Sequence, residues 1–371
     1  MIGSKINLSG LPLQELEAFV ASIDEPAYRA KQIFAWLYKH KAAQFDDMTN
    51  LPESLRQKLK EIAAVEKLRV VKKQQSKFDG TIKFLFELAD GKQIESVLIP
   101  PRKSAVDADS RFTACVSTQV GCPLDCKFCA TGTMGFERNL SPAEIIGQVS
   151  MAQTLVEKPI TNIVFMGMGE PMLNYDNVMS AIEILTSENG MGFTPRRITV
   201  STAGYVEQIK RMADEQRKVK LALSLHSLDN ETRSKLMPIT KKFGVDELLD
   251  ALEYYFKKTK KSVMLEYILF DGLNDTDNDV RRIVKASRRF ECRVNLIPFH
   301  SIAFTNPHGF SAALKGASRE KILSFAAKLR RDNIPVFVRN SSGEDIDAAC
   351  GQLAVTNLPA GRQVHIASLN P

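Results

Sequence analysis

Long apolar runs are missing from this chain of 371 residues. No segment approaches the roughly 20 consecutive apolar residues that a membrane-spanning helix needs. Residues 1–10 have neither the basic start nor the apolar core of a secretory signal peptide. These absences exclude the membrane-spanning and secreted classes, so we expect a cytoplasmic protein without membrane contact.

Cysteine is also scarce, because six cysteines in a chain of this length are too few for a disulfide scaffold. The hydrophobic content of 44% and charged content of 25% are those of an ordinary globular protein. The net charge of +7 suggests a polyanionic partner, since Lys and Arg side chains neutralise nucleic-acid phosphates. Nothing in the sequence suggests more than a monomer.

The chain divides into four segments of different character. Residues 1–66 show helical periodicity interrupted by proline and capping signals, which predicts a small helical domain. Residues 67–108 are rich in aromatic and β-branched residues and predict a β-rich antiparallel connector. Strand and helix patterns then alternate across residues 109–345, and residues 346–371 are interpreted as a terminal loop and a loose tail.

The alternating segment predicts an α/β fold with parallel strands. The predicted strands are 112–118, 160–166, 197–201, 218–225, 263–270 and 293–297. The predicted helices are 142–155, 177–187, 206–214, 245–258, 277–290 and 319–332. Six repeats fit an incomplete (βα)6 TIM-like barrel better than a closed eight-stranded one.

Three of the six cysteines, Cys122, Cys126 and Cys129, lie in one short run after the first predicted strand. Iron-sulfur clusters normally take four thiolates, so a run that supplies three leaves one iron open to a substrate or cofactor. Short cysteine spacings also suit a structural zinc ion, for which Cys115 would be the fourth ligand. Both metal sites remain possible from this run alone.

Other polar motifs follow the remaining strands, at the end of the sheet where βα proteins place their functional loops. They occupy residues 167–171, 201–204, 224–226 and 298–300. In the first motif, Gly169 and Glu170 form a turn that offers a carboxylate to a cationic ligand group. The alternative is an ordinary acidic residue at the start of a helix.

These motifs together resemble the RlmN-type RNA methyltransferases of the radical S-adenosylmethionine (SAM) superfamily. The segments that carry the resemblance are 121–132, 165–174, 201–204, 224–226 and 348–353, the last reading Ala-Ala-Cys-Gly-Gln-Leu. The resemblance extends over nearly the whole chain. It implies a radical SAM partial barrel with an N-terminal domain that assists RNA binding.

The resemblance also implies the cofactors and their ligands. One [4Fe-4S] cluster would be held by Cys122, Cys126 and Cys129, and two SAM molecules would be consumed per turnover. The residues implied in SAM binding are Gly169, Glu170, Ser201, Ser224, Leu225, His226 and His300. His300 departs from the family, which commonly has asparagine there. An electron donor such as flavodoxin is a further implied partner.

The implied reaction is methylation of adenosine C2 in 23S rRNA, at the peptidyl transferase centre, and in tRNA, 3′ of the anticodon. C2 is electrophilic and has no lone pair, so a radical route is needed. Cys350 would first be methylated and would then carry the methyl group to the base. Glu95 would accept the C2 proton. Cys115 would resolve the protein–RNA adduct, leaving a transient disulfide with Cys350.

The residues by themselves allow plainer roles. Cys115 suits a buried core position, as does Cys292 at a strand start. Glu95 suits the solvent face of an alternating strand. Ser201, Ser224 and His226 suit polar strand ends satisfied by backbone. Cys350 has little packing reason to lie in a terminal loop, which favours a reactive thiol.

Basic residues gather in several clusters, of which residues 67–77, between the N-terminal domain and the barrel, are the preferred RNA contact. Three competing functions remain. One is a methyltransferase acting at adenosine C8, of the antibiotic-resistance type. Another is a zinc-stabilised RNA-binding protein without catalysis. The third is a radical enzyme of small-molecule metabolism.

Overall fold

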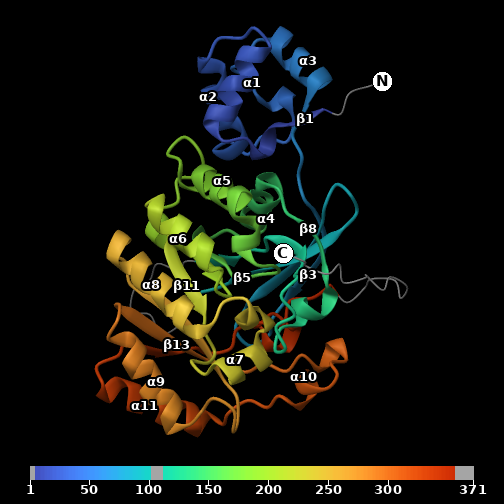
Figure 1. Cartoon of the computed structure of the whole chain (residues 1–371). Coiled ribbons are helices and arrows are strands. Elements are labelled where there is room, and N and C mark those ends of the chain that lie inside the picture. The colour runs from blue at the N-terminus through green and yellow to red at the C-terminus, as the bar shows by residue number, and fades with distance from the viewer. Residues whose placement is uncertain (1–4, 102–111, 356–371) are drawn as a thin grey trace.

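The computed structural model describes residues 5–101 and 112–355. The predicted polar loop at 102–110 and the tail from residue 356 lie outside the described residues. Three helices form the N-terminal unit at the top of Figure 1. They are α1 (Leu13–Ser22), α2 (Tyr28–Tyr38) and α3 (Glu53–Ile62). The short strands β1 (Ile6–Asn7) and β2 (Ala63–Ala64) pair in parallel and bring the two ends of this unit together.

A ten-stranded sheet forms the centre of the molecule, in the order β14-β13-β12-β11-β10-β9-β6-β5-β4-β3. Its strands are β3 (Arg69–Gln75), β4 (Ile82–Glu87), β5 (Gln93–Ile99), β6 (Phe112–Cys115), β9 (Ile160–Phe165), β10 (Ile198–Thr202), β11 (Lys220–Ser224), β12 (Val263–Leu269), β13 (Cys292–Pro298) and β14 (Val336–Val338). The strands from β6 to β14 pair in parallel, whereas β3, β4 and β5 pair antiparallel. The connector strands therefore continue the sheet of the barrel.

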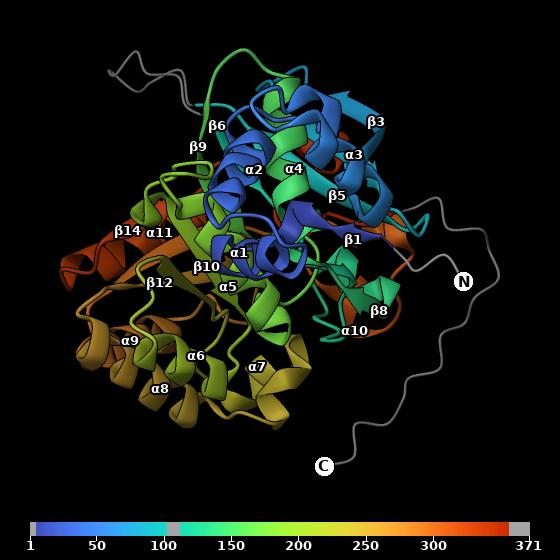
Figure 2. The same ribbon diagram turned by 90° about the horizontal axis from the view of Figure 1, so that it is seen from above.

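Helices cover the outer side of the parallel strands, as Figure 2 shows for α6, α8 and α9. The helices of this part are α4 (Pro142–Thr154), α5 (Tyr175–Thr186), α6 (Val206–Asp214), α7 (Asn230–Leu236), α8 (Val245–Thr259), α9 (Asp277–Ser287), α10 (Phe310–Ala313) and α11 (Arg319–Arg331). Each long helix buries one apolar face. In α6, Val206, Ile209 and Met212 are buried at the three-residue spacing of a single helical stripe.

The predicted βα order is confirmed, with three additions and one change; one addition is the short helix α10, which follows β13. A seventh parallel strand, β14, follows α11 and pairs with β13. Helix α7 lies between β11 and α8 in a segment where no helix was predicted. The first predicted strand is split, because β6 ends at Cys115 and a separate strand, β7 (Gln119–Gly121), begins four residues later. Pairing of β7 with β8 (Phe136–Asn139) makes a small hairpin outside the main sheet.

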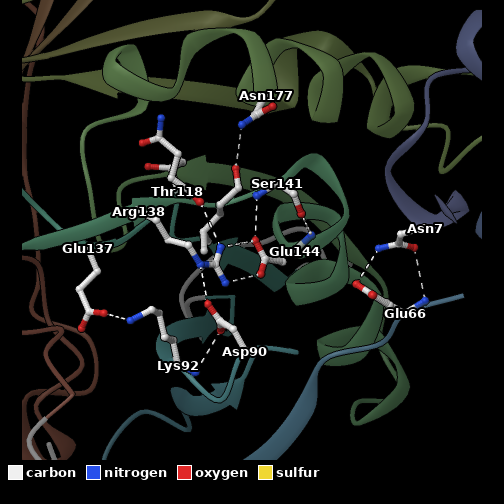
Figure 3. Close-up of polar contacts among 12 residues, drawn as sticks. Asn7, Glu66, Asp90, Lys92, Thr118, Glu137, Arg138, Ser141, Glu144 and Asn177 are labelled. Atoms are coloured by element: carbon white, nitrogen blue, oxygen red, sulfur yellow. Dashed lines mark hydrogen bonds and ion pairs between the residues drawn. The ribbon is translucent and has the colours of Figure 1, made fainter. Parts of the chain in front are cut away.

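An ion-pair network fixes this hairpin to the rest of the molecule (Figure 3). The guanidinium of Arg138 in β8 contacts Asp90, in the turn between β4 and β5, at 2.7 Å. It also contacts Glu144 in the first turn of α4 at 2.8 Å. Glu144 is the acidic partner in a capping box with Ser141, so the start of α4 and the hairpin share one carboxylate. The network thereby holds β8, at the end of the loop between β7 and β8.

Among the described residues, none of the helices combines the length and the apolar character needed to cross a bilayer.

Candidate active site

The cysteine run occupies the loop between β7 and β8. Backbone hydrogen bonds hold this loop: the N–H of Cys122 donates to the carbonyl of Gly135 at 2.7 Å, and that of Ala130 donates to Gly351 at 2.7 Å. The N–H of Lys127 donates to Leu236 at the end of α7, at 2.9 Å. Side chains of all three cysteines line one cavity of about 150 Å³. We call this the cofactor cavity.

The cofactor cavity is also lined by the motifs that follow the parallel strands. Its other polar and glycine residues are Thr131, Gly167, Gly169, Glu170, Ser201, Thr202, Ser224, His226, Glu266, Cys350 and Gly351. Thr131 belongs to the cysteine loop and Glu266 lies in the middle of β12, whereas the others come from the ends of β9, β10 and β11 and from the C-terminal loop. Parallel strands place their carboxyl ends at one edge, which brings residues far apart in sequence to one cavity.

Glu170 is buried and its carboxylate is held by two backbone donors. The N–H of Met172 donates to Oε1 at 3.0 Å, and the N–H of Ala203 donates to Oε2 at 2.8 Å. Burial raises the pKa of Glu170 to about 7, against the lowering effect of these hydrogen bonds. Glu170 thus caps the short helix η4 (Pro171–Asn174), as in the plainer interpretation. A carboxylate has lone pairs beyond these two bonds, so Glu170 also remains able to accept from a cationic ligand.

Close packing between two loops requires glycine at position 169. Its φ of +99° lies in the left-handed region, and a Cβ would come within 2.8 Å of the backbone N of Gln119. Gln119 in turn accepts the N–H of Glu170 through Oε1 at 2.8 Å. The glycine therefore lets the β9 loop press against β7, which orients the carboxylate that follows it.

The residues at the end of β11 divide between the cavity and the core. His226 lines the cavity and is buried; its Nδ1 accepts the N–H of Ile268 at 3.1 Å. Burial lowers the pKa of His226 to about 3, so the imidazole is neutral. Ser224 faces the cavity, whereas Leu225 is buried and is not among the lining residues. Leu225 contributes through its backbone, since its carbonyl accepts from Arg233 at 3.1 Å.

A second cavity, of about 80 Å³, adjoins the first. We call it the thiol cavity because Cys115, Cys129 and Cys350 line it. Cys129 and Cys350 also line the cofactor cavity, so these two residues stand in the wall between the two spaces. Cys115 is buried at the end of β6, and burial raises the pKa of its thiol to about 12. Cys350 is exposed.

His300 belongs to the thiol cavity and does not line the cofactor cavity. It is buried, and burial lowers its pKa. Its Nδ1 lies 3.6 Å from a carboxylate oxygen of Glu344 and has no hydrogen-bond partner among the described residues. The arrangement therefore puts His300 in the same cavity as the loop that carries Cys350.

Glu95 lies in neither of these spaces. It lines a further cavity of about 160 Å³ with Lys72, Lys83 and Ala354, which we call the Glu95 cavity. Its carboxylate contacts Nζ of Lys83 at 3.1 Å and accepts the N–H of Ala354 at 3.0 Å. Both side chains of the ion pair are 8% exposed. Because Glu95 is buried, its predicted position on the solvent face of the strand is wrong. Burial raises the pKa of Glu95, and the nearby charge of Lys83 opposes that rise.

Two charged residues at or near the cofactor cavity were not predicted from the sequence as site residues. Glu266 interrupts the apolar strand β12, and that interruption was a usable signal. It is buried, accepts from Asn295 at 2.8 Å, and leaves Oε2 without a partner among the described residues. Arg233 lies in α7, whose polar sequence looks like a surface helix, so no signal pointed to it.

The donor set fits a cluster that takes three protein thiolates. Cys122, Cys126 and Cys129 face one cavity beside an oriented carboxylate, Glu170. In a [4Fe-4S] cluster each thiolate binds a different iron, so the three sulfurs need not meet at one ion. Across residues 5–101 and 112–355, no three His, Cys, Asp or Glu side chains are placed to hold a single metal ion. All six cysteines are free, so Cys115 and Cys350 are not joined by a disulfide.

Known proteins are similar to this chain over most of its length. Residues 116–285 match the Radical SAM superfamily, and residues 6–65 match the ribosomal RNA large subunit methyltransferase N-terminal domain. The chain is 43% identical to a probable dual-specificity RNA methyltransferase RlmN of Christiangramia forsetii, over 94% of this chain and 96% of that protein. The protein of the same description from Salinibacter ruber is also 43% identical, covering 94% of both chains.

A solved structure agrees in fold over the same length. The crystal structure of a radical SAM methyltransferase from Sphaerobacter thermophilus is 42% identical, with a TM-score of 0.84. The match covers 94% of this chain and 99% of that one. The α/β fold with its N-terminal helical unit is therefore shared with an experimentally determined protein.

Proposed function

Because this chain belongs to the RlmN family of radical SAM RNA methyltransferases, we propose that it methylates C2 of adenosine in 23S rRNA and in tRNA. The observation that carries the proposal is the pair of adjoining cavities. One is lined by the three-cysteine loop and the other by two further thiols, and Cys350 stands in the wall between them. A thiol in that position can exchange a group between a cofactor on one side and a base on the other.

The cofactor cavity would hold one [4Fe-4S] cluster on Cys122, Cys126 and Cys129. SAM would lie beside it, with its amino-acid ammonium near Glu170. Together these groups supply a methyl donor and the one-electron chemistry that an electrophilic carbon requires. Ser201, Ser224 and His226 would orient the cofactor. The neutral imidazole of His226 adds no positive charge next to the sulfonium.

Cys350 would hold the transferred carbon as a thioether during the reaction. Glu95 would take the proton that leaves C2, and its raised pKa suits a proton acceptor. The unpaired electron left after radical addition and loss of the C2 proton would return to the oxidised cluster. Cys115 would then form a sulfur–sulfur bond with Cys350 as the bond between that sulfur and the product carbon breaks; the electron pair of the broken bond would stay on the carbon, which takes the thiol proton and becomes the methyl group. The disulfide needs two electrons for its return to thiols, which a reductant such as flavodoxin would supply.

RNA would approach from the side of β3 and the Glu95 cavity. Strand β3 is the edge of the sheet and is mostly exposed, and it carries Lys72 and Lys73 in the preferred basic segment. Lys72 also lines the Glu95 cavity. Basic side chains at its mouth would neutralise phosphates flanking the target base.

The test is a reconstituted reaction. The protein would be purified anaerobically, loaded with iron and sulfide, and incubated with reductant, SAM and unmodified rRNA fragment or tRNA. Nucleoside mass spectrometry would compare the products with C2- and C8-methyladenosine standards, with Cys350→Ala protein as the matched control. C2-methyladenosine from both RNAs is the expected result. The C8 isomer would assign the chain to the resistance-type activity instead, and zinc without iron would contradict the cofactor assignment.

A further inference from the structure

Arg233 is the largest side chain that is fully buried in the described part of the molecule, with 1% of its surface exposed. Arginine is among the residue types least often buried, because removing its charge from water is costly unless another charge or a set of acceptors compensates. The burial of Arg233 therefore needs a physical explanation.

Hydrogen bonds to uncharged groups satisfy the guanidinium. Nη2 donates to the carbonyl oxygens of Ala203 at 2.6 Å and Ser224 at 3.2 Å. Nε donates to Leu225, and Nη1 donates to the hydroxyl of Thr240 in the short helix η6 (Pro238–Lys241) at 2.8 Å. These bonds tie the ends of β10 and β11 to α7. They do not neutralise the positive charge.

No carboxylate forms an ion pair with Arg233 within residues 5–101 and 112–355. The titratable groups that act on it are the neutral His226, whose pKa it lowers, and the thiol of Cys126. Cys126 is the middle member of the three-cysteine loop.

The backbone places Arg233 directly behind the cofactor cavity. Ala203 and Ser224, whose carbonyls it binds, both line that cavity. The other end of α7 is fastened to the cysteine loop, because the carbonyl of Leu236 accepts the N–H of Lys127. The cation is therefore fixed relative to the three thiols by hydrogen bonds on two sides.

We propose that Arg233 is the buried counter-charge of the anionic iron-sulfur cluster and that its positive charge raises the cluster's reduction potential. This inference rests on the proposed function for the presence of the cluster. Three thiolates on a [4Fe-4S] core give a net negative charge, which increases when the cluster takes up an electron. A fixed cation in a low-dielectric wall stabilises the more negative, reduced form more strongly. Net charge and hydrogen bonding near the cluster are known determinants of its potential.

The test measures the cluster and needs no RNA. Reconstituted wild-type, Arg233→Met and Arg233→Lys proteins would be poised at one fixed potential, and the reduced cluster would be quantified by electron paramagnetic resonance. We expect the ratio of reduced to oxidised cluster to fall at least tenfold in Arg233→Met, about 59 mV for a one-electron couple. Arg233→Lys keeps the positive charge but loses the planar guanidinium and its set of hydrogen-bond donors. Its ratio of reduced to oxidised cluster should stay within about threefold of wild type.

Lys127→Met is the matched control. Lys127 lies between two of the cysteines, but it is partly exposed and pairs with Asp125 at 2.5 Å. Solvent screens such a charge, so this substitution should leave the ratio unchanged. If Lys127→Met lowered the ratio of reduced to oxidised cluster as much as Arg233→Met does, the claim that the effect depends on a buried charge would be overturned.

The remaining outcomes also decide the matter. An unchanged ratio in Arg233→Met would overturn the proposal, as would an equal fall in Arg233→Lys, which would assign the effect to hydrogen bonds. If Arg233→Met and Arg233→Gln hold no cluster while Arg233→Lys does, the requirement for charge stands. If Arg233→Lys also holds none, the proposal fails. Wild-type protein that takes up no iron would instead refute the proposed function, before any variant is compared.

Discussion

The backbone N–H of Ala354 donates a hydrogen bond to Oε2 of Glu95 at 3.0 Å, although the two residues are 259 positions apart. The next residue back, Leu353, lines the thiol cavity. The C-terminal segment therefore contacts Glu95 at Ala354 and lines the thiol cavity, with Cys115 and Cys350, at Leu353. If Glu95 accepts the proton as proposed, the hydrogen bond from Ala354 would have to break before Oε2 could do so.

Glu95→Gln should abolish methylated RNA while leaving Cys350 methylation intact. The amide keeps the size of the side chain but cannot accept the C2 proton. Intact-protein mass spectrometry would detect the methyl group on Cys350, and nucleoside mass spectrometry would detect the product. Glu87→Gln is the control, because Glu87 lies on the neighbouring strand and pairs with the exposed Arg69. Normal product formation by Glu95→Gln would remove Glu95 from the reaction.

The thiols predict three distinct phenotypes. Cys350→Ala should form no methylated RNA yet still cleave SAM reductively, because the three proposed cluster ligands and Glu170 are unchanged. Cys115→Ala should accumulate a covalent protein–RNA adduct, visible as a shifted band on a denaturing gel. Cys292→Ala should turn over normally, since Cys292 is buried at the start of β13 and lines neither the cofactor cavity nor the thiol cavity. Repeated rounds of RNA methylation by Cys115→Ala, with no trapped adduct, would show that the reaction does not need two thiols.

Gly169→Ala should weaken SAM binding at least tenfold and lower stability by several kcal/mol. A left-handed alanine costs roughly 1 kcal/mol or more, and its Cβ would also strike the backbone of Gln119, at 2.8 Å. Gly192→Ala separates the two effects, because Gly192 has a φ of +70° but open space around its Cβ. Thermal denaturation and equilibrium SAM binding would measure both variants. Equal losses in the two would mean that the close approach at Gly169 is unimportant.

The neutral His226 predicts a pH dependence of stability. The pKa of His226 is depressed to about 3 in the folded protein, from 6.5 for an ordinary histidine. The unfolded chain therefore binds more protons at this residue below pH 6.5, so its contribution is full above pH 6.5 and is lost as pH falls. The loss is about 1.4 kcal/mol per pH unit.

Urea unfolding of wild type and His226→Asn between pH 7 and pH 5 would check this slope. Asparagine can accept the N–H of Ile268 but does not titrate, so the two curves should converge as pH falls. Parallel curves would mean that His226 is protonated without penalty.

Much of the architecture followed from local pattern. The helices and the six predicted parallel strands begin and end within a few residues of the expected positions, because each carries its own apolar periodicity. The exceptions are informative. Strand β14 has three residues, too few to show a period, and α7 lacks an apolar stripe because Arg233 occupies one of its two buried positions.

The sequence by itself determined the family, the order of βα units and the three-cysteine loop, because these depend on residue types at short spacing. Tertiary structure decided the rest. It put His300 with Cys350, Glu95 against Lys83 and Ala354, and Arg233 against the backbone that lines the cofactor cavity. Each of those relationships joins segments distant in sequence, and alternation along a strand says which neighbours share a face but not what faces them. Burial and charge pairing, which set the pKa values and the direction of each prediction, arise only when those segments meet.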